Sequence, residues 1–453
     1  MGLFFGTDGL RGRLEKGLSA EIAFRCGNAL ASINQCHKNQ KILIGTDTRK
    51  TCDLLSLMFA SGAMSAGADV VFVGVCPTAA IGFLTKEKEF DFGVVISASH
   101  NPAEFNGIKI FNDNGLKISE EFETEIEKRM LEISSLNFEK IGRLKIDFSM
   151  VCEYAEFLKT VTKDELKQFL IENLSGLCVV FDTANGSASS IAPKVFEELG
   201  ARVCVLSNQP NGLNINKDCG SLHIQNLRQK VIETNADMGF AFDGDSDRLV
   251  AIDENGDVVD GDQLIYIFAK YYLTLGKLTK NVVVGTVHTN SGIEASLNKL
   301  GLKLIRTNVG DKFVSDVLEA QGLLIGGEQS GHIFLKDKLQ TGDGILNALI
   351  LSVVVKSSKK TLSKINDAVL YAQTNLSAKV TDKHSVMAKA KCEIDAIEKE
   401  LLGRARVLVR PSGTEPIIRI TVESEDKNLA RLNAEKIKNI IEKYDKGDCL
   451  CVE

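Results

Sequence analysis

A single pattern of apolar segments occurs three times in this chain, and it restricts the folds that the chain can adopt. In each copy, a first strand-like run leads through helix-like sequence to a second run that opens on glycine, and then to a third run. The first runs are residues 41–48, 178–184 and 282–288, the second are 67–73, 200–206 and 301–306, and the third are 92–96, 238–242 and 323–326. Strands that alternate with helices in this way predict an α/β protein with three repeated domains and mostly parallel sheets.

The last part of the chain, from about residue 367, does not follow this pattern. It contains helix-like stretches and a strand–loop–strand signal, with strands at 405–409 and 417–422, which we interpret as a smaller C-terminal α+β domain. At roughly 150 residues per domain, a chain of 453 residues has room for three or four domains. The predicted domains are residues 1–149, 150–252, 253–366 and 367–453.

The composition excludes several classes of partner. Hydrophobic residues make up 44% of the chain and charged residues 25%, which is the balance of a soluble globular protein. The net charge of −6 comes with no basic stripe, which argues against a nucleic-acid partner. The 11 cysteines form no C-x-x-C pair and no secretory signal is evident, a usage typical of reduced thiols in the cytoplasm. The longest apolar stretch, residues 344–355, is too short to span a bilayer, so we expect a cytoplasmic protein without a membrane partner.

Each of the three third strands leads into a polar loop of different chemistry. The loops read SASHNP at residues 97–102, DGDSDR at 243–248 and GEQSGH at 327–332. In open α/β sheets, ligands bind beyond the carboxyl ends of the strands. Three equivalent strand ends with polar loops therefore predict one cleft that is shared by the domains.

The acidic loop of the second copy predicts a metal site. Asp243, Asp245 and Asp247 alternate directly after an apolar strand, and three carboxylates this close repel one another unless a cation neutralises them. An EF-hand is excluded because Arg248 stands where that loop needs glycine, although Glu254 falls at its twelfth position. Oxygen ligands favour Mg²⁺ or Ca²⁺, and the room left for a phosphate oxygen favours Mg²⁺ with a phosphorylated group.

Two further loops carry groups that recognise sugars and phosphates. Residues 410–419, Arg-Pro-Ser-Gly-Thr-Glu-Pro-Ile-Ile-Arg, join two guanidinium groups to hydroxyl and amide donors, which predicts an anion site rather than a bare turn. Glu328 and Ser330 alternate acceptor and donor groups of the kind that bind sugar hydroxyls. His332, taken alone, is more typical of a structural histidine.

Ser99 does not belong to a hydrolase triad. It is adjacent to His100, so the two side chains point apart in an extended chain, and the sequence has no G-x-S-x-G elbow. Taken alone, Ser99 is more typical of a capping serine. With a metal nearby, however, its hydroxyl could carry a phosphoryl group.

Taken together, the four loops resemble those of the α-D-phosphohexomutase superfamily over essentially the whole chain. Within it, GTDGLRG at residues 6–12, ISASHNP at 96–102 and GEQSGH at 327–332 are similar to bacterial members that act on glucosamine phosphates. The resemblance implies four domains around a central cleft. It also implies reversible conversion of glucosamine 6-phosphate to glucosamine 1-phosphate, on the route to UDP-N-acetylglucosamine and the cell wall. Glucosamine 1,6-bisphosphate is the implied intermediate and a candidate activator.

The resemblance also implies a role for each matching residue. Ser99 matches the phosphoserine, and an oxygen of Ser99 or of its phosphate completes a Mg²⁺ site with the three aspartates. The implied proton-transfer groups are Lys109 and His332, the cleft arginines are Arg11 and Arg248, and the sugar contacts are His100, Glu328 and Ser330. The implied phosphate clamp consists of Arg410, Ser412, Gly413, Thr414 and Arg419. Phe105 and Ser246 depart from the residues common in related enzymes, at positions that carry no chemistry.

Two other functions stay open on the sequence. Phosphomannomutase/phosphoglucomutase activity uses the same chemistry on a sugar with a 2-hydroxyl group, and only Gln329 favours the amino sugar. A non-catalytic protein that binds a sugar phosphate or a metal would need the same binding loops. The resemblance suggests a homodimer, whereas the sequence itself does not give the oligomeric state.

Overall fold

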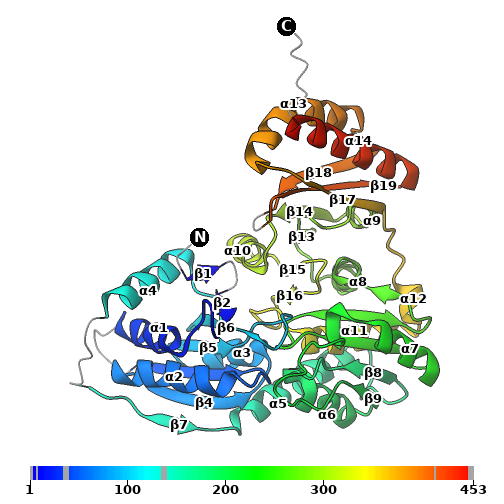
Figure 1. Ribbon diagram of the computed structural model, residues 1–453. Coiled ribbons are helices and arrows are strands. Elements are labelled where there is room, and N and C mark those ends of the chain that lie inside the picture. Colours follow the sequence, from blue (N-terminus) through cyan, green and yellow to red (C-terminus); the bar gives the residue numbers. More distant parts are fainter. Residues whose placement is uncertain (1–3, 7–8, 34–39, 134–139, 413–414, 447–453) are drawn as a thin grey trace. The chain divides into compact units, whose positions relative to one another are not determined.

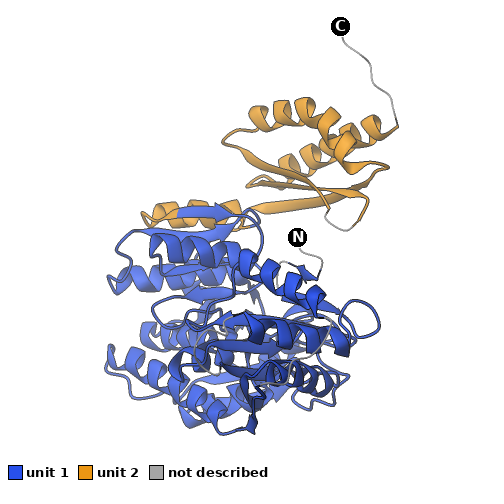
Figure 2. Ribbon diagram, turned by 90° about the vertical axis from the view of Figure 1, so that its left-hand side faces the viewer, with its two compact units in different colours: residues 1–288, 304–367 blue, residues 289–303, 368–453 orange. Residues whose placement is uncertain are grey.

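The computed structural model describes residues 4–6, 9–33, 40–133, 140–412 and 415–446, which fall into two compact units. Unit 1 comprises residues 1–288 and 304–367, and unit 2 comprises residues 289–303 and 368–453 (Figure 2). Unit 1 contains three β-sheets with their helices, and unit 2 contains one three-stranded sheet (Figure 1). None of the helices in the described part of the chain is both long enough and apolar enough to cross a membrane.

The first sheet of unit 1 has the strand order β1-β2-β6-β5-β3-β4-β7. Its strands are β1 (Phe5–Gly6), β2 (Gly9–Arg13), β3 (Lys41–Thr46), β4 (Asp69–Val75), β5 (Phe92–Ile96), β6 (Phe105–Asn112) and β7 (Leu144–Ile146). Its helices are α1 (Ala20–Ser32), α2 (Cys52–Ser65), α3 (Thr78–Glu87) and α4 (Glu120–Glu132). Helices α1 and α2 pack closely because Gly27 and Gly62 lie against backbone carbonyls of the partner helix, where any side chain would clash.

The second sheet has the order β12-β11-β10-β8-β9, and the third has the order β14-β13-β15-β16. The strands are β8 (Cys178–Asp182), β9 (Arg202–Leu206), β10 (Met238–Phe242), β11 (Leu249–Asp253), β12 (Val258–Val259), β13 (Val282–Thr286), β14 (Lys303–Thr307), β15 (Ile325–Gly327) and β16 (Ile333–Leu335). The helices are α5 (Met150–Lys167), η1 (Ser187–Ser190), α6 (Ala192–Glu198), η2 (Gly220–Leu222), α7 (Gln225–Thr234), α8 (Gly261–Thr274), α9 (Ser291–Lys299), α10 (Asp311–Gln321), α11 (Gly344–Ser358) and α12 (Leu362–Ile365).

The internal repeat predicted from the sequence is present in the strand order. In each sheet the third strand of the copy (β5, β10 or β15) lies beside the first (β3, β8 or β13), and the second (β4, β9 or β14) lies outside the first. The pairings β3–β5, β8–β10 and β13–β15 are parallel. All residues of β5, β8 and β10 are buried, as expected for apolar strands covered on both faces. The predicted class of repeated α/β domains is thus confirmed.

The sheets are more mixed than the sequence pattern suggested. After its polar loop, each third strand is followed by a strand that returns antiparallel beside it, in the pairs β5–β6, β10–β11 and β15–β16. The first sheet gains two further antiparallel pairings, β2–β6 and β1–β2. Each site loop is therefore the turn of a hairpin, which fixes both of its ends in one sheet.

Unit 2 is an α+β structure, as predicted for the C-terminal region. Its strands form an antiparallel sheet in the order β17-β19-β18. The elements are β17 (Ala372–Lys379), α13 (Lys383–Glu400), β18 (Ala405–Pro411), β19 (Ile417–Ser424) and α14 (Lys427–Asp445). Helix α14 buries Ala430, Ala434, Ile437 and Ile441, a spacing of three and four residues that forms one apolar face.

Helix α9 groups with unit 2 although it follows β13 in the chain. Its N-cap residue Asn290 donates a hydrogen bond from Nδ2 to the Tyr371 carbonyl at 3.0 Å. The Val369 amide donates to the hydroxyl of Ser296 at 3.0 Å. The four domain boundaries given above stay predictions.

The most apolar helix, α11, begins at a buried carboxylate. Asp343 accepts hydrogen bonds from the amides of Ile345 and Leu346 at 2.9 and 3.0 Å, and the Tyr154 hydroxyl donates to it at 2.8 Å. Burial raises the pKa of Asp343 to about 6 despite these donors. The cap therefore holds its proton at a pH at which an exposed aspartate has lost it.

This raised pKa predicts a stability that depends on pH. The folded Asp343 carboxyl keeps its proton up to about pH 6, whereas in the unfolded chain it ionises near pH 4. Because the folded state binds more protons over this range, its stability decreases as the pH rises. We expect the free energy of unfolding to fall by about 2 kcal/mol between about pH 4.5 and pH 7, measured by denaturant titration. The variant Asp343→Asn should lack this component, and equal pH slopes for the two proteins would contradict the assignment.

Candidate active site

The loop that carries Ser99 connects β5 to β6 and is held in an unusual backbone conformation. Ser99 is buried and has a φ of 52°, in the left-handed region that a serine seldom adopts. Its amide donates to the hydroxyl of Ser97 at 2.9 Å, and the Ser97 hydroxyl donates to Asp47 at 2.7 Å. A residue whose strained backbone conformation is held by neighbouring groups is typical of a functional site.

The Ser99 hydroxyl points at the acidic loop of the second sheet. Its Oγ donates to Oδ2 of Asp243 at 2.6 Å and lies 3.2 Å from Nδ1 of His100. The expectation that the Ser99 and His100 side chains point apart is therefore wrong, because the left-handed backbone of Ser99 is not extended. Asp243 follows β10, whereas Ser99 follows β5, so equivalent strand ends of two different sheets meet here. Burial lowers the pKa of His100 to about 4, helped by the positive charges of Arg248 and Arg11. The imidazole beside Ser99 is therefore neutral near pH 7.

The three aspartates form a compact buried cluster. Asp243, Asp245 and Asp247 each offer a carboxylate oxygen, and these oxygens lie within 4.8 Å of one another. Oδ1 of Asp245 and Oδ1 of Asp247 are buried without a hydrogen-bond partner. Burial and the neighbouring carboxylates of Asp247 and Asp245 raise the pKa of Asp243 well above its usual range. Buried carboxylate oxygens that accept no hydrogen bond, gathered in such a cluster, fit a hard divalent cation such as Mg²⁺.

Lys109 supplies positive charge to the same cluster from β6. Its Nζ donates to Asp245 at 2.7 Å and to Asp247 at 2.9 Å, and its side chain is fully buried. Thr78, at the start of α3, donates from Oγ1 to Asp245 at 2.5 Å. Although burial acts to raise the pKa of Asp247, the charges of Lys109 and His332 outweigh it, so this pKa lies well below the usual range. The first domain thus neutralises part of the acidic loop of the second.

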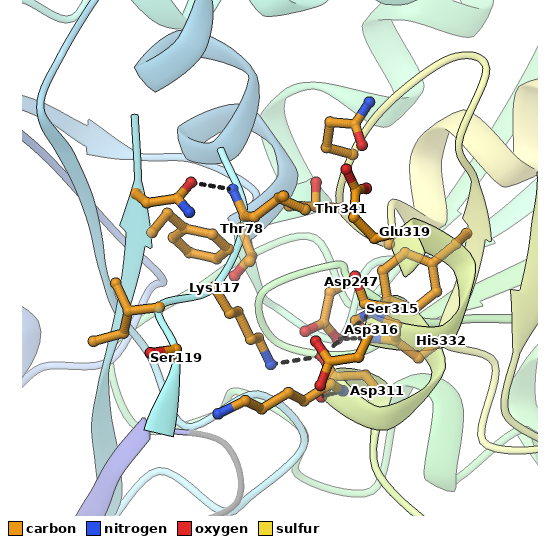
Figure 3. Close-up of a pocket in the computed structure, with 18 of the residues that line it drawn as sticks. Thr78, Lys117, Ser119, Asp247, Asp311, Ser315, Asp316, Glu319, His332 and Thr341 are labelled. Carbon is orange, nitrogen blue, oxygen red and sulfur yellow. Dashed lines mark hydrogen bonds and ion pairs between the residues drawn. The ribbon is translucent and has the colours of Figure 1, made fainter. Parts of the chain in front are cut away.

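His332 lies between two carboxylates at one wall of a cavity. Its Nδ1 is 3.6 Å from Asp247 and its Nε2 is 3.5 Å from Asp311, whose carboxylate also accepts a hydrogen bond from Lys117 at 2.5 Å. Burial opposes a charged imidazole, but Asp247 and Asp311 overcome this and raise the pKa of His332. Figure 3 shows these residues around the cavity, which has a volume of about 450 Å³. His332 therefore connects the acidic loop to the third domain.

The GEQSGH loop provides groups of two kinds. Glu328 is buried and accepts a hydrogen bond from the Gly310 amide at 2.9 Å, whereas Ser330 is exposed. Gln329 donates from Nε2 to Asp260, the N-cap of α8, at 3.2 Å. The amide group of Gln329, which alone favoured an amino sugar on the sequence, is therefore used to hold a helix cap.

The cleft arginines lie around the same loops. Arg11 stands on β2, where its register partner is Gly107 of β6. Arg248 follows the acidic loop, and its amide donates to Oδ1 of Asp243 at 3.2 Å. Both side chains are close enough to His100 for their charges to lower its pKa. They place positive charge near the His100 imidazole, whose Nδ1 lies 3.2 Å from Oγ of Ser99.

The predicted phosphate clamp lies in unit 2, and the structure describes three of its five residues. Arg410 of β18 and Arg419 of β19 are register partners, so their side chains leave the same face of the sheet. Like charges directly opposite each other are unfavourable unless an anion lies between them. Ser412 is buried and its Oγ accepts from the Glu415 amide at 3.4 Å. Gly413 and Thr414 lie outside the described residues.

The sequence reading did not identify two residues that hold the Ser99 loop. Arg49 is buried, pairs with Asp47 at 2.9 Å and donates to the carbonyls of Ser99 and Asn101 at 2.9 and 2.8 Å. Asn216 donates from Nδ2 to the same two carbonyls at 2.8 and 3.0 Å. The polar turn after the strand at residues 41–46 was a usable signal for Arg49, whereas no strand or motif marked Asn216.

Comparison with known proteins identifies the relatives of this chain. Four profiles of the phosphoglucomutase/phosphomannomutase family match it, namely alpha/beta/alpha domains I, II and III at residues 2–137, 153–256 and 260–371, and the C-terminal domain at 374–440. Among solved structures, a phosphoglucomutase/phosphomannomutase family protein from Burkholderia thailandensis shares the fold with a TM-score of 0.80 at 22% identity, over 98% of this chain and 97% of that one. An N-acetylphosphoglucosamine mutase from Aspergillus fumigatus, solved in complex with GlcNAc-6P and magnesium, has a TM-score of 0.68 at 16% identity, over 98% of this chain and 96% of that one.

Sequence relatives are closer than these structures. The phosphoglucosamine mutase of Caldicellulosiruptor bescii is 44% identical over 98% of this chain and 99% of its own length. The phosphoglucosamine mutase of Clostridium acetobutylicum is 43% identical over the same shares of the two chains. With identity at this level over nearly the whole length, the chain belongs to the phosphoglucosamine mutases within the phosphoglucomutase/phosphomannomutase family.

Proposed function

We propose that this chain is an isomerase that interconverts glucosamine 6-phosphate and glucosamine 1-phosphate through a phosphoserine. The observation that carries the proposal is the 2.6 Å hydrogen bond between the Ser99 hydroxyl and Asp243, at the point where the polar loops of two sheets meet. A hydroxyl held against a buried acidic cluster is placed for phosphoryl transfer. The full-length similarity to phosphoglucosamine mutases supports glucosamine phosphates as the substrates.

The proposed reaction has two transfers with one reorientation between them. A phosphoryl group leaves the Ser99 oxygen for a free hydroxyl of the sugar phosphate, which gives glucosamine 1,6-bisphosphate. The bisphosphate then turns, and its other phosphate returns to Ser99. Lys109 and His332 are the candidate groups that take up and return the proton of the sugar hydroxyl.

The side chains of the site have distinct parts in this scheme. Asp243, Asp245 and Asp247 would hold Mg²⁺ with an oxygen of Ser99 or its phosphate, and this ion would neutralise the charge that builds up on the transferred group. Arg11 and Arg248 add positive charge near Ser99.

Recognition of the sugar has to work in both orientations of the bisphosphate. Glu328 and Ser330, with His100, would bind the ring hydroxyls. The phosphate that does not react would be held by the clamp residues Arg410, Ser412, Gly413, Thr414 and Arg419. Because the Arg410 and Arg419 side chains leave the same face of a sheet, a phosphate between them would relieve their mutual repulsion.

The first experiment tests the phosphoserine and distinguishes the alternative functions. The purified protein should convert glucosamine 6-phosphate to glucosamine 1-phosphate, and intact-mass analysis should find one added phosphate that maps to Ser99. Ser99→Ala should abolish both, whereas Ser61→Ala, which removes an exposed hydroxyl from α2, should abolish neither.

Two results would contradict the proposal. Faster turnover of glucose or mannose phosphates would favour phosphoglucomutase/phosphomannomutase activity. If the protein bound a sugar phosphate but showed neither turnover nor a phosphorylated serine, a non-catalytic binding protein would be favoured.

The acidic cluster predicts a strict requirement for a divalent cation. Chelation of divalent ions should stop turnover, and added Mg²⁺ should restore it. Asp245→Asn removes one of the negative charges that would hold the ion, so we expect turnover to fall by at least about 100-fold. Asp113→Asn is the matched control because Asp113 lies in the exposed turn after β6. A variant of Asp245 with normal turnover and unchanged dependence on Mg²⁺ would refute the proposed role of the cluster.

The clamp predicts a change in substrate affinity rather than in the chemical step. Arg419→Ala removes one guanidinium, so KM should rise by about tenfold or more while kcat changes much less, since hydrogen bonds to charged groups contribute about 1.5–3 kcal/mol. Arg419 forms an exposed ion pair with Glu415, and Arg431 of α14 forms a similar pair with Glu435. Arg431→Ala is therefore the control, and an equal effect of the two substitutions on KM would exclude a clamp at Arg419.

A further inference from the structure

The backbone carbonyls of Ser99 and Asn101 each accept two hydrogen bonds from side chains. One donor is Nη2 of Arg49, at 2.9 and 2.8 Å, and the other is Nδ2 of Asn216, at 2.8 and 3.0 Å. These bonds hold the two residues on either side of the His100 position. The φ of 52° at Ser99 needs such support, because the left-handed region is energetically unfavourable for a serine.

The two donors come from different parts of unit 1. Arg49 follows β3 in the same sheet as Ser99 and is anchored by a fully buried ion pair with Asp47. It also donates to the carbonyls of Pro102 and Phe105, so it holds the whole loop within its own domain. Loss of Arg49 would leave Asp47 buried without its ion pair, and the effects of such a variant on folding and on catalysis would be mixed.

Asn216 instead belongs to the domain that carries the acidic loop. It lies in the connection between β9 and α7. Its backbone amide donates to the Ala184 carbonyl, just beyond β8, at 2.9 Å. Gly244 of the acidic loop lies close to both the Ser99 carbonyl and the Asn216 side chain. A side-chain carbon at Gly244 would lie 2.7 Å from the Ser99 carbonyl oxygen and 3.0 Å from Nδ2 of Asn216. The acidic loop, Asn216 and the Ser99 loop are therefore in direct contact.

We propose that Asn216 is a positioning residue that sets the placement of the Ser99 oxygen against the acidic loop. The inference rests on the proposed function, in which Ser99 and the three aspartates act on one phosphoryl group. Phosphoryl transfer depends on alignment, and a shift of about 1 Å costs about 100-fold in rate. The side-chain amide of Asn216 donates to the Ser99 loop from the second domain, so its loss should act on kcat rather than on substrate binding.

The test replaces Asn216 by glycine. Its φ of 57° is left-handed, so glycine keeps the backbone conformation and removes only the side-chain donor. Asn235→Gly is the matched control, because Asn235 has a φ of 49° at the end of α7 and lies in the same domain. We expect Asn216→Gly to lower kcat by about 10- to 100-fold, with KM within about twofold of the wild type. The control should have normal kinetics.

Mg²⁺ binding gives a second measurement that does not depend on turnover. In the phosphorylated protein, a misplaced Ser99 phosphate should weaken Mg²⁺ binding, so Asn216→Gly should raise the Mg²⁺ dissociation constant about tenfold. In a Ser99→Ala background the ion has only the aspartates, and the same substitution should change this constant by less than about twofold. A merely structural role for Asn216 would weaken Mg²⁺ binding equally in both backgrounds.

A second variant keeps the inference testable if the first variant folds poorly. Asn216→Asp keeps the size and the left-handed preference but turns a donor into an acceptor that faces two carbonyl oxygens, so its kcat should be lower still. Melting temperatures identify which variants are folded, and wild-type kcat in either folded variant would overturn the inference. The two proposals fail in different ways. If the wild-type chain shows no mutase turnover, the proposed function is wrong; if the wild type turns over and Asn216→Gly equals the control, only the inference is wrong.

Discussion

The buried acidic cluster is the constraint on which the rest of unit 1 depends. Three carboxylates from one short loop cannot stay buried together unless positive charge and donors surround them. The first domain supplies Lys109 and Thr78, and the third supplies His332. Separating these domains would leave charges uncompensated, so the same electrostatics that suit a cation also join three sheets. The contacts that hold the three sheets together are therefore the same contacts that surround the candidate cation site.

The repeat explains why the contacts between the three site loops lie at one place. In all three copies the loop follows the third strand, which lies beside the first strand of the same copy, and leads into an antiparallel return strand. The framework is constant, and only the residues in the loop differ: a hydroxyl at Ser99, carboxylates at Asp243 to Asp247, and Glu328 with His332. Loops on a rigid framework can diverge without cost to the core. Three chemically different loops are therefore compatible with one repeated fold.

The sequence predicted the nine strands of the repeat and the loops that follow them, because buried parallel strands are nearly continuous apolar runs. It did not predict the return strands such as β6, where Asn106 and Lys109 interrupt the apolar pattern. Asn106 donates to Thr51 at the start of α2, and Lys109 donates to the acidic loop. Asn216 was missed for another reason: it acts through its side-chain amide from an irregular connection, and its partners are carbonyls more than 100 residues away in the chain. Contacts of this kind leave no local pattern. Gln329 shows that a residue in a recognised motif can also have a local structural contact that the motif does not predict, here a hydrogen bond to a helix cap.

The backbone of Ser99 bears on the choice between an enzyme and a simple binding protein. A protein that only binds a sugar phosphate needs the acidic cluster, the paired arginines and Glu328, but it gains nothing from a serine in the left-handed region. Non-glycine residues in that region cost about 1 kcal/mol or more. Here Arg49 and Asn216 together direct four hydrogen bonds to the carbonyls of Ser99 and Asn101, and Ser97 adds another to the Ser99 amide. So much support for the backbone that carries one hydroxyl is typical of a site where the position of that hydroxyl determines a rate, which favours catalysis at Ser99.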